Sequence, residues 1–263
     1  MYVLVCLLYL ANFTQYMNLE GYGPLWSLAV EEQFYLVWPF LVRYLRLRTL
    51  AIVCLGSIVL TPLLRFLTVT GTLHLGDLYT ATWLLTDNLA VGALLAVVLR
   101  TPAATLPRIR ALTWGLAVTG GVLIALGLRF NFITRSTTAG AALQAEPFLL
   151  LFASLLLLSL QYGSHPTVFR LTRPLRFFGY ISYGLYLLHL VGFKIYQDLF
   201  TDLRHPVAEL TLGPYLLRFC VVLGATTVVC FLSRRYFEEY FLQLKDRLVP
   251  YTSPGDRSKA KPS

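Results

Sequence analysis

Long blocks of apolar residues constrain this chain more than any other feature of its sequence. Each block is roughly 15 to 22 residues long, the length at which a helix crosses a hydrocarbon core of about 30 Å. Blocks such as 149–160 are apolar on every face, whereas a helix of a soluble protein shows an amphipathic stripe. Only 13% of the residues are charged, about half the usual share in a soluble domain. The sequence therefore predicts an all-α, polytopic transmembrane helix bundle rather than a soluble all-α protein.

The positions of these blocks predict roughly eight membrane spans. They cover approximately residues 2–17, 25–42, 50–69, 83–99, 111–129, 147–162, 178–197 and 213–233. Basic residues follow the connections on one side, and the positive-inside rule places that side, with both termini, in the cytoplasm. This bias explains the net charge of +9, so we expect no nucleic-acid partner. Arg65, Lys194 and Arg218 lie near the outer ends of spans, where long side chains can reach the membrane interface.

One transmembrane domain, residues 1–248, is expected to account for nearly all of the chain. Residues 249–263 lack an apolar period, so we expect a disordered cytoplasmic tail. The four cysteines lie within apolar blocks and lack the spacing of metal ligands, so we predict neither a metal site nor a disulfide framework. The first span has no charged residues in front of it and does not look like a signal peptide.

Two adjacent carboxylates and an amide interrupt the second predicted span, whose helix should begin near Leu25. These are Glu31, Glu32 and Gln33. An ionised side chain at membrane depth costs a few kcal/mol or more, so such residues commonly mark functional sites. A carboxylate here can serve as a general base or acid. In the structural alternative, the glutamates pair with buried donors of neighbouring helices and lock the bundle. Helical geometry brings Tyr35 within hydrogen-bonding reach of either carboxylate.

The run from Trp26 to Pro39, WSLAVEEQFYLVWP, resembles the WSLAVEEQFYLLWP block of the acyltransferase-3 family of integral-membrane O-acyltransferases. Residues 79–96 are similar to a second block of that family, in which an arginine precedes an aspartate by two positions. Asp87 holds the aspartate position, but Leu85 stands in place of the arginine, so this block supplies no partner for Asp87. The alternative for Asp87 is a helix N-cap or an outer-loop carboxylate.

Residues 175–189 are similar to a third block of the family, L-R-x-L-G-x-I-S-Y-G-L-Y-L-W-H. On a helix, Ser182, Tyr186 and His189 lie near one face, and such a polar stripe should face the bundle interior or a water-filled cavity. His189 can shuttle a proton or steady the acyl donor. The alternative is a histidine that only packs. Residues 233–241 resemble the closing segment of the family, where a basic and acidic membrane-exit segment is the simpler interpretation.

The resemblance implies transfer of an acyl group other than an amino-acyl group, usually acetyl, from acyl-CoA to a hydroxyl. The implied acceptor is a cell-surface glycan, a lipid-linked sugar or a glycosylated metabolite, and the implied location is a bacterial inner or plasma membrane. It implies no tightly bound cofactor, and acetyl-CoA and membrane lipids are the other expected partners. The candidate catalytic residues are Glu31, Glu32 and His189. The candidate substrate-binding residues are Trp26, Gln33, Tyr35, Asp87, Ser182 and Tyr183.

Family members also carry further helices in front, including an Arg…His block, and nothing before Trp26 matches them. The chain therefore resembles the C-terminal two-thirds of a family member, whether as a fragment, a mis-called start or a degenerate copy. Two other function classes stay open. A proton-coupled transporter would also carry intramembrane glutamates and a histidine, although it would favour two related halves, which this sequence lacks. The other is a catalytically dead fragment that acts as an interaction protein.

Overall fold

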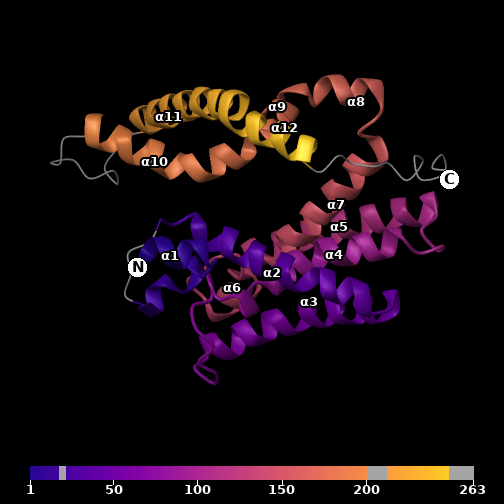
Figure 1. Ribbon diagram of the computed structural model, residues 1–263. Coiled ribbons are helices and arrows are strands. Elements are labelled where there is room, and N and C mark those ends of the chain that lie inside the picture. Colours follow the sequence, from indigo (N-terminus) through magenta and orange to yellow (C-terminus); the bar gives the residue numbers. More distant parts are fainter. Residues whose placement is uncertain (18–21, 201–211, 249–263) are drawn as a thin grey trace, which may run out of the picture. The chain divides into compact units, whose positions relative to one another are not determined.

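The computed structural model describes residues 1–17, 22–200 and 212–248, and the regular secondary structure of these residues is entirely helical (Figure 1). The all-α prediction is thus confirmed for the described part of the chain. The predicted tail, residues 249–263, lies outside the described residues. The chain divides into two compact units, residues 1–169 and 170–263.

The first unit is a helix bundle in which α3 packs along α4 and α5 packs along α7. Its apolar core joins Leu95 of α4 to Ala153 and Leu157 of α7. The elements of this unit are α1 (Tyr2–Leu7), η1 (Ala11–Met17), α2 (Leu25–Tyr44), α3 (Leu47–Val69), η2 (Thr82–Leu84), α4 (Thr86–Leu99), α5 (Leu106–Phe130), α6 (Thr138–Leu143) and α7 (Glu146–Tyr162). The division between the units falls within α8 (Pro166–Leu171).

The first predicted span, residues 2–17, is two short helices rather than one long helix. Tyr9 adopts a left-handed φ of 54°, and the N–H of Leu10 donates to the carbonyl of Val5 at 2.9 Å. This hydrogen bond closes α1 in the manner of a Schellman cap. The 6 residues of α1 extend only about 9 Å, too short to cross a bilayer. Glycine or asparagine usually marks such a cap, and a tyrosine gives no stop signal in the sequence.

Four helices of the described residues are long and apolar enough to cross a membrane. They are Leu47–Val69, Leu106–Phe130, Thr138–Tyr162 and Leu212–Leu244. These helices contain the predicted spans 50–69, 111–129, 147–162 and 213–233. The other predicted spans are shorter, interrupted or more polar, so the total of eight stays a prediction.

The second unit is built on the close packing of α10 (Ser182–Phe200) and α11 (Leu212–Ser233). A Cβ on Gly192 of α10 would lie 2.6 Å from the Thr226 hydroxyl oxygen of α11, so a larger residue there would force the neighbouring side chains to shift. The unit also contains α9 (Arg173–Tyr180), a π-helical turn (Arg234–Glu238) and α12 (Glu239–Leu248). The predicted span 178–197 is divided at Ile181, where the backbone leaves α-helical geometry at φ −106° and ψ 7°.

Gly120 allows α5 and α7 to approach closely, and the adjacent Gly121 provides a matched control for a glycine-to-alanine substitution. A Cβ on Gly120 would lie 2.9 Å from Leu151 Cγ and 3.0 Å from the Pro147 carbonyl oxygen. A Cβ on Gly121 would meet no atom within 4 Å. We predict that Gly120→Ala lowers the free energy of unfolding by about 1–3 kcal/mol, the usual cost of overpacking. Gly121→Ala should leave it unchanged or raise it by up to about 1 kcal/mol, since alanine favours a helix.

Thermal denaturation of the purified variants in detergent measures this difference. Equal melting temperatures for the two variants would contradict the close approach of α5 and α7.

Candidate functional site

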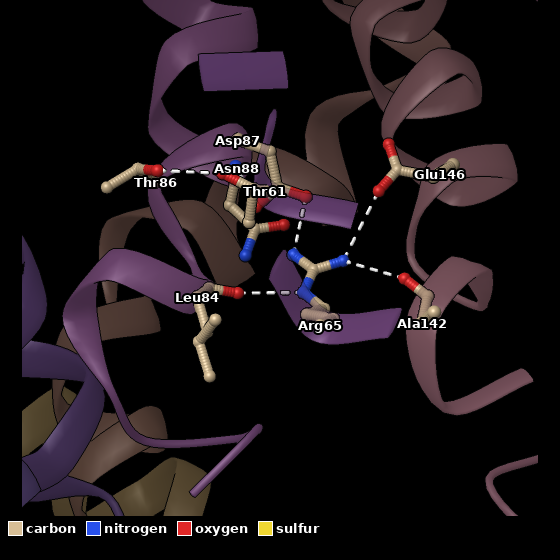
Figure 2. A network of polar contacts seen from close by, with 8 residues as sticks. All are labelled: Thr61, Arg65, Leu84, Thr86, Asp87, Asn88, Ala142 and Glu146. Atoms are coloured by element: carbon tan, nitrogen blue, oxygen red, sulfur yellow. Dashed lines mark hydrogen bonds and ion pairs between the residues drawn. The ribbon is translucent and has the colours of Figure 1, made fainter. Parts of the chain in front are cut away.

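A buried ion network lies at one end of the first unit, where α3 ends and α4 and α7 begin (Figure 2). Arg65 of α3 is 4% exposed, and Asp87 in the first turn of α4 is 0% exposed. Arg65 Nη2 lies 2.5 Å from Asp87 Oδ2, and Arg65 Nη1 lies 3.2 Å from Glu146 Oε1 at the start of α7. The guanidinium also donates to the carbonyls of Leu84, at 2.7 Å, and Ala142, at 3.2 Å. One side chain thus joins three separate segments.

The geometry of the guanidinium explains how a charge is tolerated in this position. Arginine presents five N–H donors in one plane, and here four contacts use them. Asp87 is satisfied as well, because its Oδ1 accepts the backbone N–H of Asn88 at 2.9 Å. A buried charge that loses its partner costs several kcal/mol, so Arg65 and the buried Asp87 depend on each other.

This network corrects the interpretation of Arg65 as a side chain that reaches the membrane interface. Its guanidinium turns into the bundle, where Asp87, Glu146 and two carbonyl groups accept its hydrogen bonds. The family block has an arginine at the position of Leu85, and in this chain Arg65 of α3 supplies the cation for Asp87 instead. Asp87 is accordingly no outer-loop carboxylate. The sequence analysis did not predict that Arg65 and Glu146 belong to this site. The position of Arg65 within an apolar block was nevertheless a signal, because an arginine there needs a partner.

A second polar network fixes α2 against η1 and the segment before α4. Thr82 donates its hydroxyl to Gln33 Oε1 at 2.5 Å, and Gln33 Nε2 donates to Asn12 Oδ1 at 3.0 Å. Asn12 closes the ring by donating to the Thr82 hydroxyl at 3.0 Å. Gln33 Nε2 also donates to the carbonyl of Tyr9 at 2.7 Å. The amide of Gln33, a predicted substrate contact, is therefore fully used within the fold, and its direct contact with substrate stays a prediction.

The two glutamates of α2 are accessible, and they have no ion-pair or hydrogen-bond partner among the described residues. Glu31 is exposed and Glu32 is half-buried. The expected hydrogen bond from Tyr35 is absent in this part of the chain, because the Tyr35 side chain is directed outward and 55% exposed. Its ring instead meets the edge of the Phe34 ring at a centroid distance of 6.1 Å. Both carboxylates therefore remain available to a substrate or partner.

A cavity of about 290 Å³, lined by both polar and apolar side chains, lies beside the Arg65 network. It is lined by residues from the start of α2, the end of α3, the starts of α4 and α7, and the segments that connect them. Trp26 contributes to this lining, as does Arg65 itself. Gln33 lines a different, largely apolar cavity of about 390 Å³ between α2, α3 and α4. Trp26 thus lies apart from Gln33, although sequence reasoning grouped them as substrate-binding residues.

The candidate residues of the second unit all lie on α10. His189 Nδ1 lies 2.7 Å from the carbonyl oxygen of Tyr186 and 3.2 Å from that of Leu185. A carbonyl oxygen only accepts hydrogen bonds, so Nδ1 donates in these contacts and Nε2 is left for another partner. Ser182 is exposed and donates its hydroxyl to the Gly179 carbonyl at 2.9 Å. Tyr183 is 54% exposed, and its hydroxyl has no hydrogen bond with another described residue.

Comparison with known proteins defines the class of this chain. Residues 2–235 match the model of the acyltransferase domain Acyl_transf_3. The chain therefore belongs to the acyltransferase-3 family. The match begins at residue 2, whereas the first family motif that we recognised in the sequence begins at Trp26. The peptidoglycan O-acetyltransferase OatA of Listeria monocytogenes is 30% identical to this chain over an alignment 249 residues long. The alignment covers 85% of this chain and 37% of that protein. The chain thus spans little more than a third of that relative. No solved structure matches the chain.

The interdependence of the buried ions can be tested by removing the arginine. We predict that Arg65→Met lowers the free energy of unfolding by about 3–5 kcal/mol, because it leaves the buried Asp87 without its cation. Arg129→Met is the control, since Arg129 is exposed at the end of α5 and takes part in none of the ion pairs of the described residues. The control should stay within about 0.5 kcal/mol of the parent protein. Thermal denaturation in detergent provides the measurement, and a parent-like melting temperature for Arg65→Met would refute the interdependence.

Proposed function

We propose that this chain is the membrane-embedded part of an O-acyltransferase that moves an acetyl group from acetyl-CoA to a hydroxyl of a cell-surface glycan. The observation that carries this proposal is the match of residues 2–235 to an acyltransferase domain. The related protein is named for O-acetylation of peptidoglycan, which favours a glycan acceptor. Both favour an acyltransferase over a proton-coupled transporter. The choice of acyl-CoA as donor rests on the family resemblance of the sequence motifs alone.

We further propose a multi-pass location in a bacterial cell membrane, with eight spans and both termini on the cytoplasmic side. Four long apolar helices support a membrane location. The arginines of the α2–α3 and α4–α5 connections support the orientation, because both connections lie at the same end of the first unit (Figure 1). The positive-inside rule makes that end cytoplasmic. Arg65 lies at the opposite end of α3, so the cavity beside it would open toward the outside.

The proposed reaction joins the acceptor oxygen to the acyl carbon and breaks the carbon–sulfur bond of the thioester. A base must take the hydroxyl proton, which finally protonates the departing thiolate. Glu31 and Glu32 are the carboxylates that we assign to proton transfer or to orienting the hydroxyl, because they are accessible and unpaired among the described residues. His189 offers Nε2 as a second proton acceptor, since its Nδ1 is bonded to its own helix.

The negative charge that develops on the acyl oxygen requires hydrogen-bond donors. Ser182 and Tyr183 are the hydroxyl donors that we assign to substrate. Tyr183 is the freer of the two, because the Ser182 hydroxyl already donates to Gly179. Trp26, Tyr35 and Asp87 keep their proposed substrate-binding roles, with a difference for Asp87. Its complete burial means that it acts through Arg65 rather than by touching substrate.

The glutamate assignment can be tested in membranes from cells that express the protein. We predict that Glu31→Gln or Glu32→Gln lowers transfer of labelled acetate to surface glycan by at least about 100-fold, the lower range for loss of general acid–base catalysis. Glu239→Gln is the matched control, since among the described residues the Glu239 side chain accepts one hydrogen bond, from the Tyr180 hydroxyl at 2.9 Å, which glutamine can also accept. It should retain parent-level transfer at equal expression.

Transfer that persists in both glutamine variants would remove the glutamates from the mechanism. Equal labelling of glycan with the parent protein and with an empty vector would refute the enzymatic proposal for this chain.

A further inference from the structure

The cavity beside Arg65, which mixes polar and apolar side chains in its lining, has the dimensions of a binding site for one small molecule. Its volume of about 290 Å³ lies at the lower end of the roughly 300–1,000 Å³ typical of small-molecule sites. This volume suits a sugar ring, and it is small for a nucleotide-bearing coenzyme. The helix ends that form it are tied together by the Arg65 network, so the cavity is held in shape before any ligand enters.

The walls of this cavity combine flat aromatic surfaces with unused hydrogen-bonding groups. Trp26 and Phe148 supply the aromatic surfaces on which the apolar face of a sugar ring can lie, and Tyr79 adds a third ring to the lining. Asn88 and Gln144 supply two side-chain amides, and neither makes a side-chain hydrogen bond with another described residue. Planar amides both donate and accept, as ring hydroxyls require. Flat apolar faces beside free amides are the surroundings that a sugar ring needs.

Arg135 adds an uncompensated positive charge to this lining. Arg135 is exposed, and its guanidinium carbon lies 4.2 Å from the centre of the Tyr79 ring, a cation–π contact that keeps the charge at this wall of the cavity. Arg135 takes part in none of the ion pairs of the described residues, in contrast to Arg65, whose charge is already matched by Asp87. The Arg135 guanidinium makes no hydrogen bond with another described residue, so its N–H groups remain free to bind a carboxylate or phosphate with two parallel hydrogen bonds.

We propose that this cavity binds a sugar ring that carries an anionic group, with Arg135 pairing with the anion and the aromatic side chains supporting the ring. The anion is a carboxylate on the sugar or a phosphate through which the sugar is linked to a lipid. This inference rests on the proposed function in one respect, since it makes the cavity the acceptor site of a glycan acyltransferase. Arg135 would then select acidic acceptors over neutral ones.

The test is a binding measurement on purified protein in detergent, without acyl donor. The probes share one ring: N-acetylglucosamine, N-acetylmuramic acid, which adds a carboxylate, and N-acetylglucosamine 1-phosphate. The variants are Arg135→Gln and, as the control, Arg129→Gln, an exposed arginine outside the cavity. We expect the parent and the control to bind one of the acidic sugars at least about tenfold more tightly than the neutral sugar. Arg135→Gln should bind all three with the affinity of the neutral sugar.

A second variant, Phe148→Ala, should weaken binding of all three sugars by a similar factor, because it removes the stacking surface and leaves the charge in place. Equal affinities of the parent for neutral and acidic sugars would overturn the proposal, as would a preference that survives in Arg135→Gln or no detectable binding of any probe. The acidic probe that binds more tightly distinguishes a sugar carboxylate from a sugar phosphate.

Because the binding experiment measures no acyl transfer, its result is independent of whether the chain is an active acyltransferase. Acetylation of glycan without sugar binding at this cavity would refute the site alone. Sugar binding without acetylation would leave the site standing and refute the enzymatic function.

Discussion

The ion network around Arg65 is the interaction on which the arrangement of the first unit depends. An ionised side chain surrounded by apolar helices is tolerated only when its hydrogen-bonding groups find partners. Arg65 finds them on α4, on the turn before it and at the junction of α6 and α7. The network therefore fixes the starts of α4 and α7 against the end of α3. Asn88 follows Asp87 and Gln144 precedes Glu146 by two residues, so the same contacts place the amides of the cavity.

The two polar networks of this unit meet on one short stretch, residues 80–87. Thr82 bonds to Gln33 of α2, whereas Leu84 and Asp87 bond to Arg65 of α3. In between, the hydroxyls of Thr61 and Thr86 lie 2.9 Å apart and join α3 to the start of α4 (Figure 2). This stretch thus sets the position of α2, with its two glutamates, relative to the cavity. A substitution in residues 80–87 would therefore alter both the position of α2 and the cavity beside Arg65, although these residues do not bond to either glutamate.

Local features of the structure followed from the sequence, and features that depend on distant partners did not. Apolar blocks long enough to cross a bilayer identified α3, α5, α7 and α11, because length and composition are properties of a segment alone. The start of α2 at Leu25 also agreed with prediction. The break at Tyr9 was missed because a left-handed tyrosine leaves no compositional signal. The pairing of Arg65 with Asp87 was missed because the two residues lie on different helices, 22 positions apart.

The most direct test of the structural role of the Arg65–Asp87 pair is to move the arginine to position 85, where the family motif has it. Leu85 lines the same cavity as Arg65, so an arginine at position 85 starts close to Asp87. The measurement is the melting temperature in detergent of Arg65→Leu, Leu85→Arg and the double variant. If a cation beside Asp87 is what the fold requires, the double variant will regain at least half of the stability that Arg65→Leu loses. A double variant no more stable than Arg65→Leu would show that the fold depends on other contacts of Arg65.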